Sequence, residues 1–131
     1  MKITVDTNVL VRGVVRDDEK QARAVDKALQ EASLIAVPLP CLCEFVWVLR
    51  RVYGFGNGDI AAAIRALAAT EKVVMNRPAT EAGIAILEAG GDFADGVIAY
   101  DGTWLGAETF VSFDKKAVSL LTKQEQSARL L

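Results

Sequence analysis

Five acidic residues lie at the edge of an apolar segment or inside one, where carboxylates are least expected. They are Asp6, Glu44, Asp92, Asp95 and Asp114. A partly buried carboxylate is costly unless a positive group compensates it. No matching set of Lys or Arg lies within these segments, so a bound cation is the simplest compensator. The pattern therefore predicts partly buried acids and points to a metal-dependent enzyme.

The chain contains no histidine. Its absence excludes Ser-His-Asp and Cys-His catalysis, His-ligated zinc and a histidine general base. The glycine patterns of a phosphate-binding loop and of a dinucleotide-binding turn are absent as well. Chemistry must therefore be carried by carboxylates, hydroxyls, amides and a metal.

The first two acids each have a structural alternative. Asp6 follows Ile3-Thr4-Val5 and begins Asp-Thr-Asn, which suits either a metal ligand or a helix cap. Glu44 stands in Cys-Leu-Cys-Glu-Phe-Val-Trp-Val-Leu, apolar on nearly every side, so a solvated face is not expected. A long-range ion pair of Glu44 with Arg12, Arg16 or Lys115 is the alternative to metal binding.

The other three acids lie in the second half of the chain. Asp92 and Asp95 are three residues apart, which on a helix places them on one face. Asp95 is the stronger ligand candidate, and Asp92 is a helix cap or a second contributor. Asp114 is a metal ligand or a turn residue at a strand end, with the Ser112 hydroxyl nearby. The pair 115–116, Lys-Lys, would suit a phosphate backbone.

Short β-rich runs alternate with helical stretches, a pattern typical of a parallel sheet flanked by helices. Strands are expected at 2–5, 34–37, 72–75 and 109–112. Helices are expected at 18–32, from Pro38 and Pro40 to 53, and at 59–70, 80–89, 92–105 and 115–121. The tail 122–131 is expected to be loose or to pack on a partner.

Ligands of open parallel sheets bind beyond the carboxyl ends of the strands. Asp6 and Asp114 both follow a predicted strand. If those two strands are neighbours, their carboxylates share one cleft.

The bulk properties fit one compact domain covering 1–131. The chain is 52% hydrophobic and 24% charged, with a formal charge of −2, which leaves the substrate class open. No apolar run approaches the roughly 18–20 residues of a membrane span, and the start lacks a secretory signal. Cys41 and Cys43 give no disulfide framework. We expect a reduced, cytoplasmic protein.

Four motifs in order carry a family resemblance. They are Asp-Thr-Asn at 6–8, Glu44 in a proline-led apolar helix, Asp-Phe-Ala-Asp-Gly-Val-Ile-Ala at 92–99, and Ser-Phe-Asp at 112–114. Over nearly its whole length the chain resembles the PIN-domain nucleases, above all the VapC-like toxins of bacterial toxin–antitoxin pairs.

The resemblance implies a three-layer α/β/α domain with a central, mainly parallel sheet. It implies Mg²⁺ or Mn²⁺ held by Asp6, Glu44, Asp95 and Asp114, with Asp92 close by. The implied activity is endonucleolytic hydrolysis of RNA, and the implied partners are a small antitoxin, whose tail covers the acidic cleft, and a second copy in a homodimer.

One segment departs from the family pattern. Residues 100–104 read Tyr-Asp-Gly-Thr-Trp where such proteins commonly have smaller residues. Gly102 inside a helix costs ~1 kcal/mol, so the helix is expected to kink or end early there, which affects the local substrate groove.

Two other classes of function compete with a nuclease. One is a catalytically silent PIN-like module that only binds a partner protein. The other is a Mg²⁺-dependent phosphatase or phosphoacceptor domain using Asp6. The phosphatase pattern requires a second Asp two residues later, and that position is Asn8.

Overall fold

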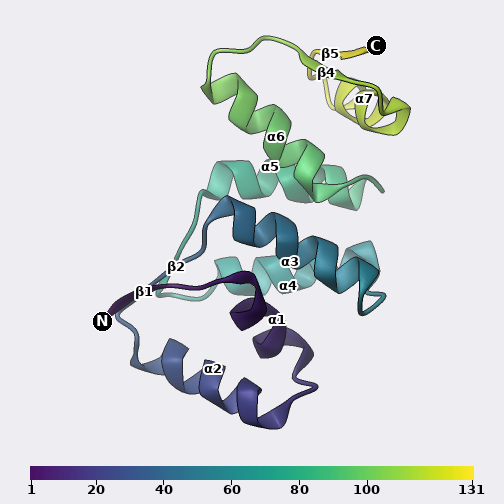
Figure 1. Ribbon diagram of the computed structural model, residues 1–131. Coiled ribbons are helices and arrows are strands. Elements are labelled where there is room, and N and C mark those ends of the chain that lie inside the picture. The colour runs from purple at the N-terminus through teal and green to yellow at the C-terminus, as the bar shows by residue number, and fades with distance from the viewer. The chain divides into compact units, whose positions relative to one another are not determined.

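The structure is a computed structural model that describes residues 1–131 (Figure 1). It contains seven helices and five strands, and every strand pair is parallel. This is the predicted α/β class, consistent with a three-layer α/β/α fold. The chain divides into two compact units, unit 1 (Met1–Asn76) and unit 2 (Arg77–Leu131).

Unit 1 is built on a sheet of three strands in the order β1–β2–β3. The strands are β1 (Lys2–Thr4), β2 (Leu34–Ala36) and β3 (Val73–Val74), and the helices are α1 (Thr7–Val15), α2 (Glu19–Glu31), α3 (Leu39–Arg51) and α4 (Asn57–Ala68). Ile35, on the middle strand, is 1% exposed. Pro40 stands in the first turn of α3, where a missing N–H does no harm.

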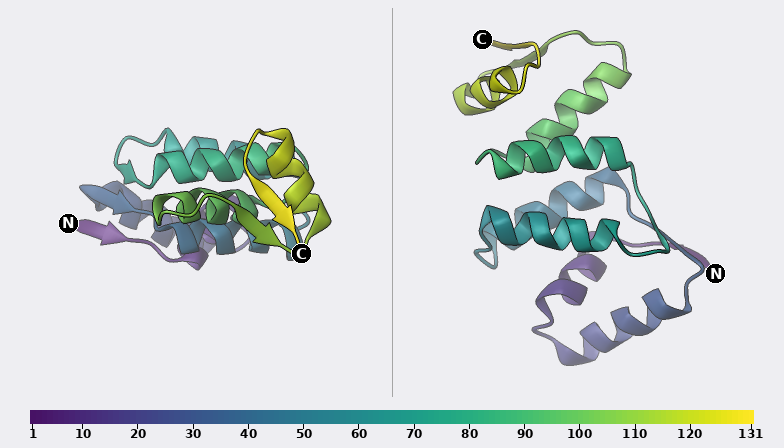
Figure 2. Two further views of the ribbon diagram at one scale, coloured as in Figure 1. Left: turned by 90° about the horizontal axis from the view of Figure 1, so that it is seen from above. Right: turned by 180° about the vertical axis from the view of Figure 1, so that it is seen from behind.

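Unit 2 holds a parallel pair of strands and three helices (Figure 2). These are α5 (Arg77–Glu88), α6 (Phe93–Trp104), β4 (Phe110–Ser112), α7 (Lys115–Lys123) and β5 (Ala128–Leu130). Ile86, Ala99 and Leu121 form a buried cluster on which Phe110, Leu120 and Ala128 pack. Between α5 and α6, Gly90 has a φ of 99°, a conformation that glycine adopts at little cost.

Helix α1 was not among the predicted elements. Its sequence is rich in valine and contains Gly13, both of which lower helix propensity. The helix forms because Asp6 caps its start and because Leu10 and Val11 become buried. Tertiary burial outweighs local propensity here.

The predicted loose tail is wrong. Residues Ala128–Leu130 form β5, which pairs with β4 in the register Phe110↔Ala128. The Leu131 N–H continues the pairing by donating to the Ser112 carbonyl oxygen at 2.9 Å. The expected early end at Gly102 is also wrong, because α6 continues through Gly102 to Trp104. The Thr103 hydroxyl donates to the Ala99 carbonyl oxygen at 3.1 Å within this last turn.

Candidate active site

Asp6 lies at the carboxyl end of β1 and is the N-cap of α1. Its Oδ1 accepts a hydrogen bond from the Val9 N–H at 3.2 Å. The side chain is exposed, and its other oxygen has no protein partner. The predicted cap role of Asp6 is therefore present, and one oxygen stays free for another ligand.

Glu44 is joined to this strand end through Thr7. The Thr7 hydroxyl donates to Glu44 Oε2 at 3.0 Å. Burial raises the pKa of the neighbouring Cys41 thiol, and the negative charges of Asp6 and Glu44 add to that rise, while a hydrogen bond with Thr7 opposes it. Asp6 and Glu44 therefore both raise the pKa of the same thiol, which places the two acids in one local group of unit 1.

Three carboxylates of unit 2 form a second group. Asp92 caps α6, with Oδ1 accepting from the Ala94 N–H at 3.2 Å. Asp114, after β4, caps α7, with Oδ1 accepting from the Ala117 N–H at 3.1 Å. Asp95 lies in the first turn of α6 and is half-buried, and its carboxylate makes no hydrogen bond or ion pair with the protein.

The pKa of Asp95 is raised. Burial is the largest cause, and the negative charges of Asp92 and Asp114 add to it. A carboxylate next to two others and without a cationic neighbour is electrostatically frustrated. Perturbed carboxylates of this kind are concentrated at functional sites.

An Asp95→Asn variant is expected to raise the melting temperature of the metal-free protein at neutral pH. Because the folded state holds the Asp95 proton more tightly than the unfolded state, the ionised carboxylate opposes folding above the raised pKa. Below the ordinary value of 3.8 the effect vanishes. The gain should therefore shrink as the pH falls through the window between the two values, in thermal denaturation with EDTA. An equal gain at every pH would contradict the electrostatic cause.

The expectation that all five acids are partly buried is wrong. Only Asp95 is half-buried, and Asp6, Glu44, Asp92 and Asp114 are exposed. None of the five pairs with Lys or Arg. Arg12 pairs with Asp17 at 2.9 Å and Arg16 with Asp26 at 2.7 Å, so neither compensates Glu44.

Three of the acids also have a structural role that can be separated from their charge. Asparagine caps helices about as well as aspartate, whereas alanine loses the acceptor. We expect Asp114→Ala to lower the free energy of unfolding by ~1 kcal/mol and Asp114→Asn to change it little, as measured by urea denaturation. Equal losses in both variants would show that the charge, not the cap, stabilises α7.

Other polar features add detail that the sequence pattern did not reveal. Ser112 Oγ accepts the Asp114 N–H at 2.9 Å, so the Ser112 hydroxyl, which we expected to lie near a ligand site, shapes the turn. The hydrogen bond between Thr7 and Glu44 was not predicted. The only sign of it in the sequence is the position of Thr7 directly after Asp6.

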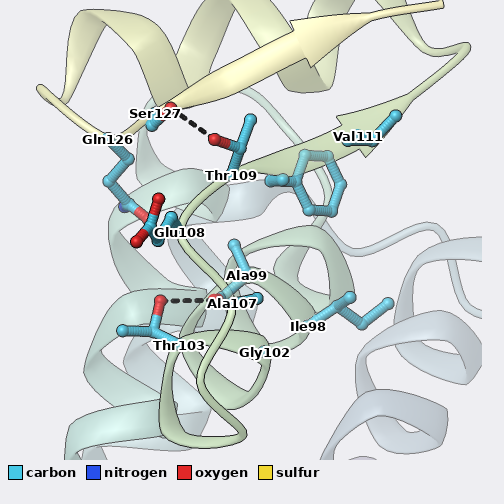
Figure 3. Close-up of a pocket in the computed structure, with 11 residues that line it drawn as sticks. Ile98, Ala99, Gly102, Thr103, Ala107, Glu108, Thr109, Val111, Gln126 and Ser127 are labelled. Carbon is cyan, nitrogen blue, oxygen red and sulfur yellow. Dashed lines mark hydrogen bonds between the residues drawn. The ribbon is translucent and has the colours of Figure 1, made fainter.

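A cavity of about 280 Å³ lies in unit 2 (Figure 3). Its wall includes Ile98 and Thr103 of α6, Val111 of β4 and the segment 126–127. The Thr109 and Ser127 hydroxyls in this wall hydrogen-bond each other at 2.9 Å. None of the five acids lines the cavity, so we do not assign it to their chemistry.

The donor chemistry of the acids fits a hard divalent cation. Carboxylate oxygens are the ligands that Mg²⁺ and Mn²⁺ prefer, and a cation would relieve the repulsion that raises the pKa of Asp95. Within neither unit do three or more Cys, Asp or Glu side chains lie where they could hold a metal ion by themselves. The convergence of Asp6 and Glu44 with Asp92, Asp95 and Asp114 stays a prediction.

The chain is thus an α/β protein with Asp6 and Asp114 after parallel strands and without histidine. The PIN domain family matches residues 3–119, which include residues of both units. The chain belongs to the PIN domain family. Proteins of this family are generally nucleases, act on RNA and typically use divalent metal ions. A comparison with curated proteins found no match.

None of the helices is long and apolar enough to cross a lipid bilayer.

Proposed function

We propose that this protein is a Mg²⁺- or Mn²⁺-dependent endoribonuclease and the toxin of a toxin–antitoxin pair. The observation that carries the proposal is a set of five acids without a cationic partner in a PIN domain, one of them with a raised pKa. Asp6, Glu44, Asp95 and Asp114 would hold the ion, with Asp92 beside them.

The side chains have distinct tasks in this proposal. Helix caps fix Asp6, Asp92 and Asp114 through Oδ1 and leave the second oxygen of each for a ligand. The Thr7 hydroxyl orients Glu44. A positive charge would stabilise the Asp95 carboxylate most, because burial has already removed part of its hydration. The bound ion would supply Lewis acidity toward the phosphoryl oxygens and a lower pKa for an attacking water.

Substrate and partner are also part of the proposal. Lys115 and Lys116 are exposed directly after Asp114 and supply positive charge for an RNA backbone. Trp47 on α3 is 60% exposed, an aromatic surface of the kind enriched at protein interfaces, which supports a homodimer. The antitoxin rests on the resemblance to VapC-like toxins.

Metal dependence is the first test. Purified protein incubated with structured RNA should cleave it in Mg²⁺ or Mn²⁺ and lose that activity in excess EDTA, because without metal the acids repel phosphate. Gel electrophoresis of the labelled RNA measures the cleavage, and adding back Mn²⁺ after EDTA is the control. Cleavage that persists in EDTA would defeat the mechanism.

A silent binding module is the second candidate, since helix capping alone explains Asp6, Asp92 and Asp114. Calorimetry separates the two. Heat of Mn²⁺ binding to the free protein, lost in Asp95→Asn, supports the nuclease, and no heat supports the module.

A further inference from the structure

Phe113 is an aromatic residue placed in solvent beside an acid of the proposed site. Its side chain is 80% exposed, and the next residue is Asp114. Side chains alternate along a strand. Phe110 packs on the buried cluster of unit 2, and Val111 and Phe113 alternate with it toward solvent. The alternation therefore aims Phe113 outward at the end of β4.

The backbone on both sides of this ring is held in place. The Asp114 N–H donates to Ser112 Oγ at 2.9 Å, and the Ala117 N–H donates to Asp114 Oδ1 at 3.1 Å. Phenylalanine has only two side-chain torsions, so its ring loses little entropy when it meets a ligand. The turn therefore exposes the flat apolar face of Phe113 on a backbone that is already held by hydrogen bonds.

Positive charge adjoins the ring. Lys115 and Lys116 are exposed, and neither forms an ion pair within the protein. An aromatic face next to cationic side chains is the combination by which proteins bind single-stranded nucleic acid, because the ring stacks on a base and the cations follow the backbone.

We propose that Phe113 stacks on an unpaired base of single-stranded RNA next to the phosphodiester that the acids act on, with Lys115 and Lys116 at the flanking phosphates. The inference rests on the proposed nuclease function and specifies its substrate as unpaired RNA. Bases in a duplex are stacked on each other and offer no free face, so duplex RNA would not gain from Phe113.

Trp104 is the competing aromatic residue, and geometry disfavours it. It is 74% exposed, but its Nε1 donates to the Tyr100 hydroxyl at 2.8 Å at the far end of α6. Nine residues separate it from Asp95, about 13 Å along the helix axis. Trp104 and the 88% exposed Leu105 therefore serve as controls for the loss of an exposed apolar side chain.

Binding of a labelled RNA oligonucleotide to the full chain tests the proposal, with Asp95→Asn in every variant to prevent cleavage. Phe113→Ala should weaken binding to the single strand by about 5- to 150-fold, the range expected for one stacked base. Phe113→Trp should restore it. Trp104→Ala and Leu105→Ala should not change it, and the annealed duplex should bind all variants equally.

An abasic scan of the same oligonucleotide locates the contact. One abasic position should weaken binding to the Phe113 protein and have no effect on Phe113→Ala, since the two changes remove the same contact. Unchanged binding of Phe113→Ala would overturn the proposal, as would full restoration by Phe113→Leu, which would indicate simple apolar burial against a partner.

The outcome is separable from that of the nuclease. If Phe113→Ala binds RNA normally while the protein with Asp95 still cleaves RNA with added metal, only the stacking proposal fails. If no variant binds RNA and the protein with Asp95 does not cleave it, the nuclease proposal fails and the stacking proposal fails with it.

Discussion

Asp95→Asn should lower the rate of RNA cleavage by at least about 100-fold while the protein stays folded. Changes to groups that merely support a metal ligand cost 10–100-fold, and loss of a ligand itself should cost no less. Asp95 is the acid with the strongest case, because it has no capping role, is half-buried, and has a raised pKa caused by burial and by Asp92 and Asp114. Initial rates of cleavage of a labelled RNA in Mg²⁺ measure the effect.

Asp101→Asn is the matched control for this experiment. Asp101 lies on the same helix, is exposed, and stands six residues further on, about 9 Å along the axis. It should retain full activity. Because Asp95→Asn is also expected to stabilise the metal-free protein, a loss of activity together with a higher melting temperature cannot be assigned to unfolding. Full activity in Asp95→Asn would remove Asp95 from the mechanism.

Helices with clear apolar periodicity and a capping residue or proline at their start could be predicted from the sequence. Helix α2 (Glu19–Glu31) lies within one residue of its expected bounds at each end, and α3 begins at its proline pair. The elements that were missed, α1 and β5, depend on contacts. Helix α1 has weak local propensity, and β5 gains its hydrogen bonds only by pairing with β4. Local sequence does not encode either contact.

The exposure of Glu44 could not be predicted, because Trp47 lies in the same exposed stripe of α3. Pro40, Glu44, Trp47 and Arg51 are all exposed and follow helical spacing. A tryptophan in that stripe makes the helix appear apolar on every side. The positions of Asp6 and Asp114 after strands and of Asp92 at a helix start could be predicted, and the degree of exposure of the acids could not.

Strand pairing is the third point on which sequence reasoning is limited. Parallel pairing was predicted and is confirmed, but β1 and β4 belong to different sheets, one in each unit. Whether the two strands are neighbours, so that Asp6 and Asp114 share one cleft, stays a prediction. Neutralising Asp6, Glu44, Asp95 and Asp114 one at a time tests this convergence, because every acid that binds the shared ion should weaken Mn²⁺ binding when its charge is removed.

Gly96→Ala should destabilise the protein strongly, although alanine is the better helix former by ~1 kcal/mol. Gly96 is buried in the first turn of α6, next to Asp95. A Cβ at this position would overlap the Ala82 carbonyl oxygen of α5 and approach the Gly83 Cα. Those atoms are backbone and cannot rotate away, so the two helices must separate. Overpacking of this kind costs about 1–3 kcal/mol, a drop in melting temperature on the order of 10 °C.

Gly102→Ala provides the opposite expectation on the same helix. A Cβ at Gly102 meets only the Ala107 Cβ, at an ordinary contact distance of 4.0 Å. The gain in helix propensity should therefore appear undiminished, raising the free energy of unfolding by up to ~1 kcal/mol. Thermal denaturation of the two variants side by side measures the difference. If both substitutions stabilised the protein, α5 and α6 would not be in close contact at Gly96. The position of Asp95 beside that contact would then be wrong.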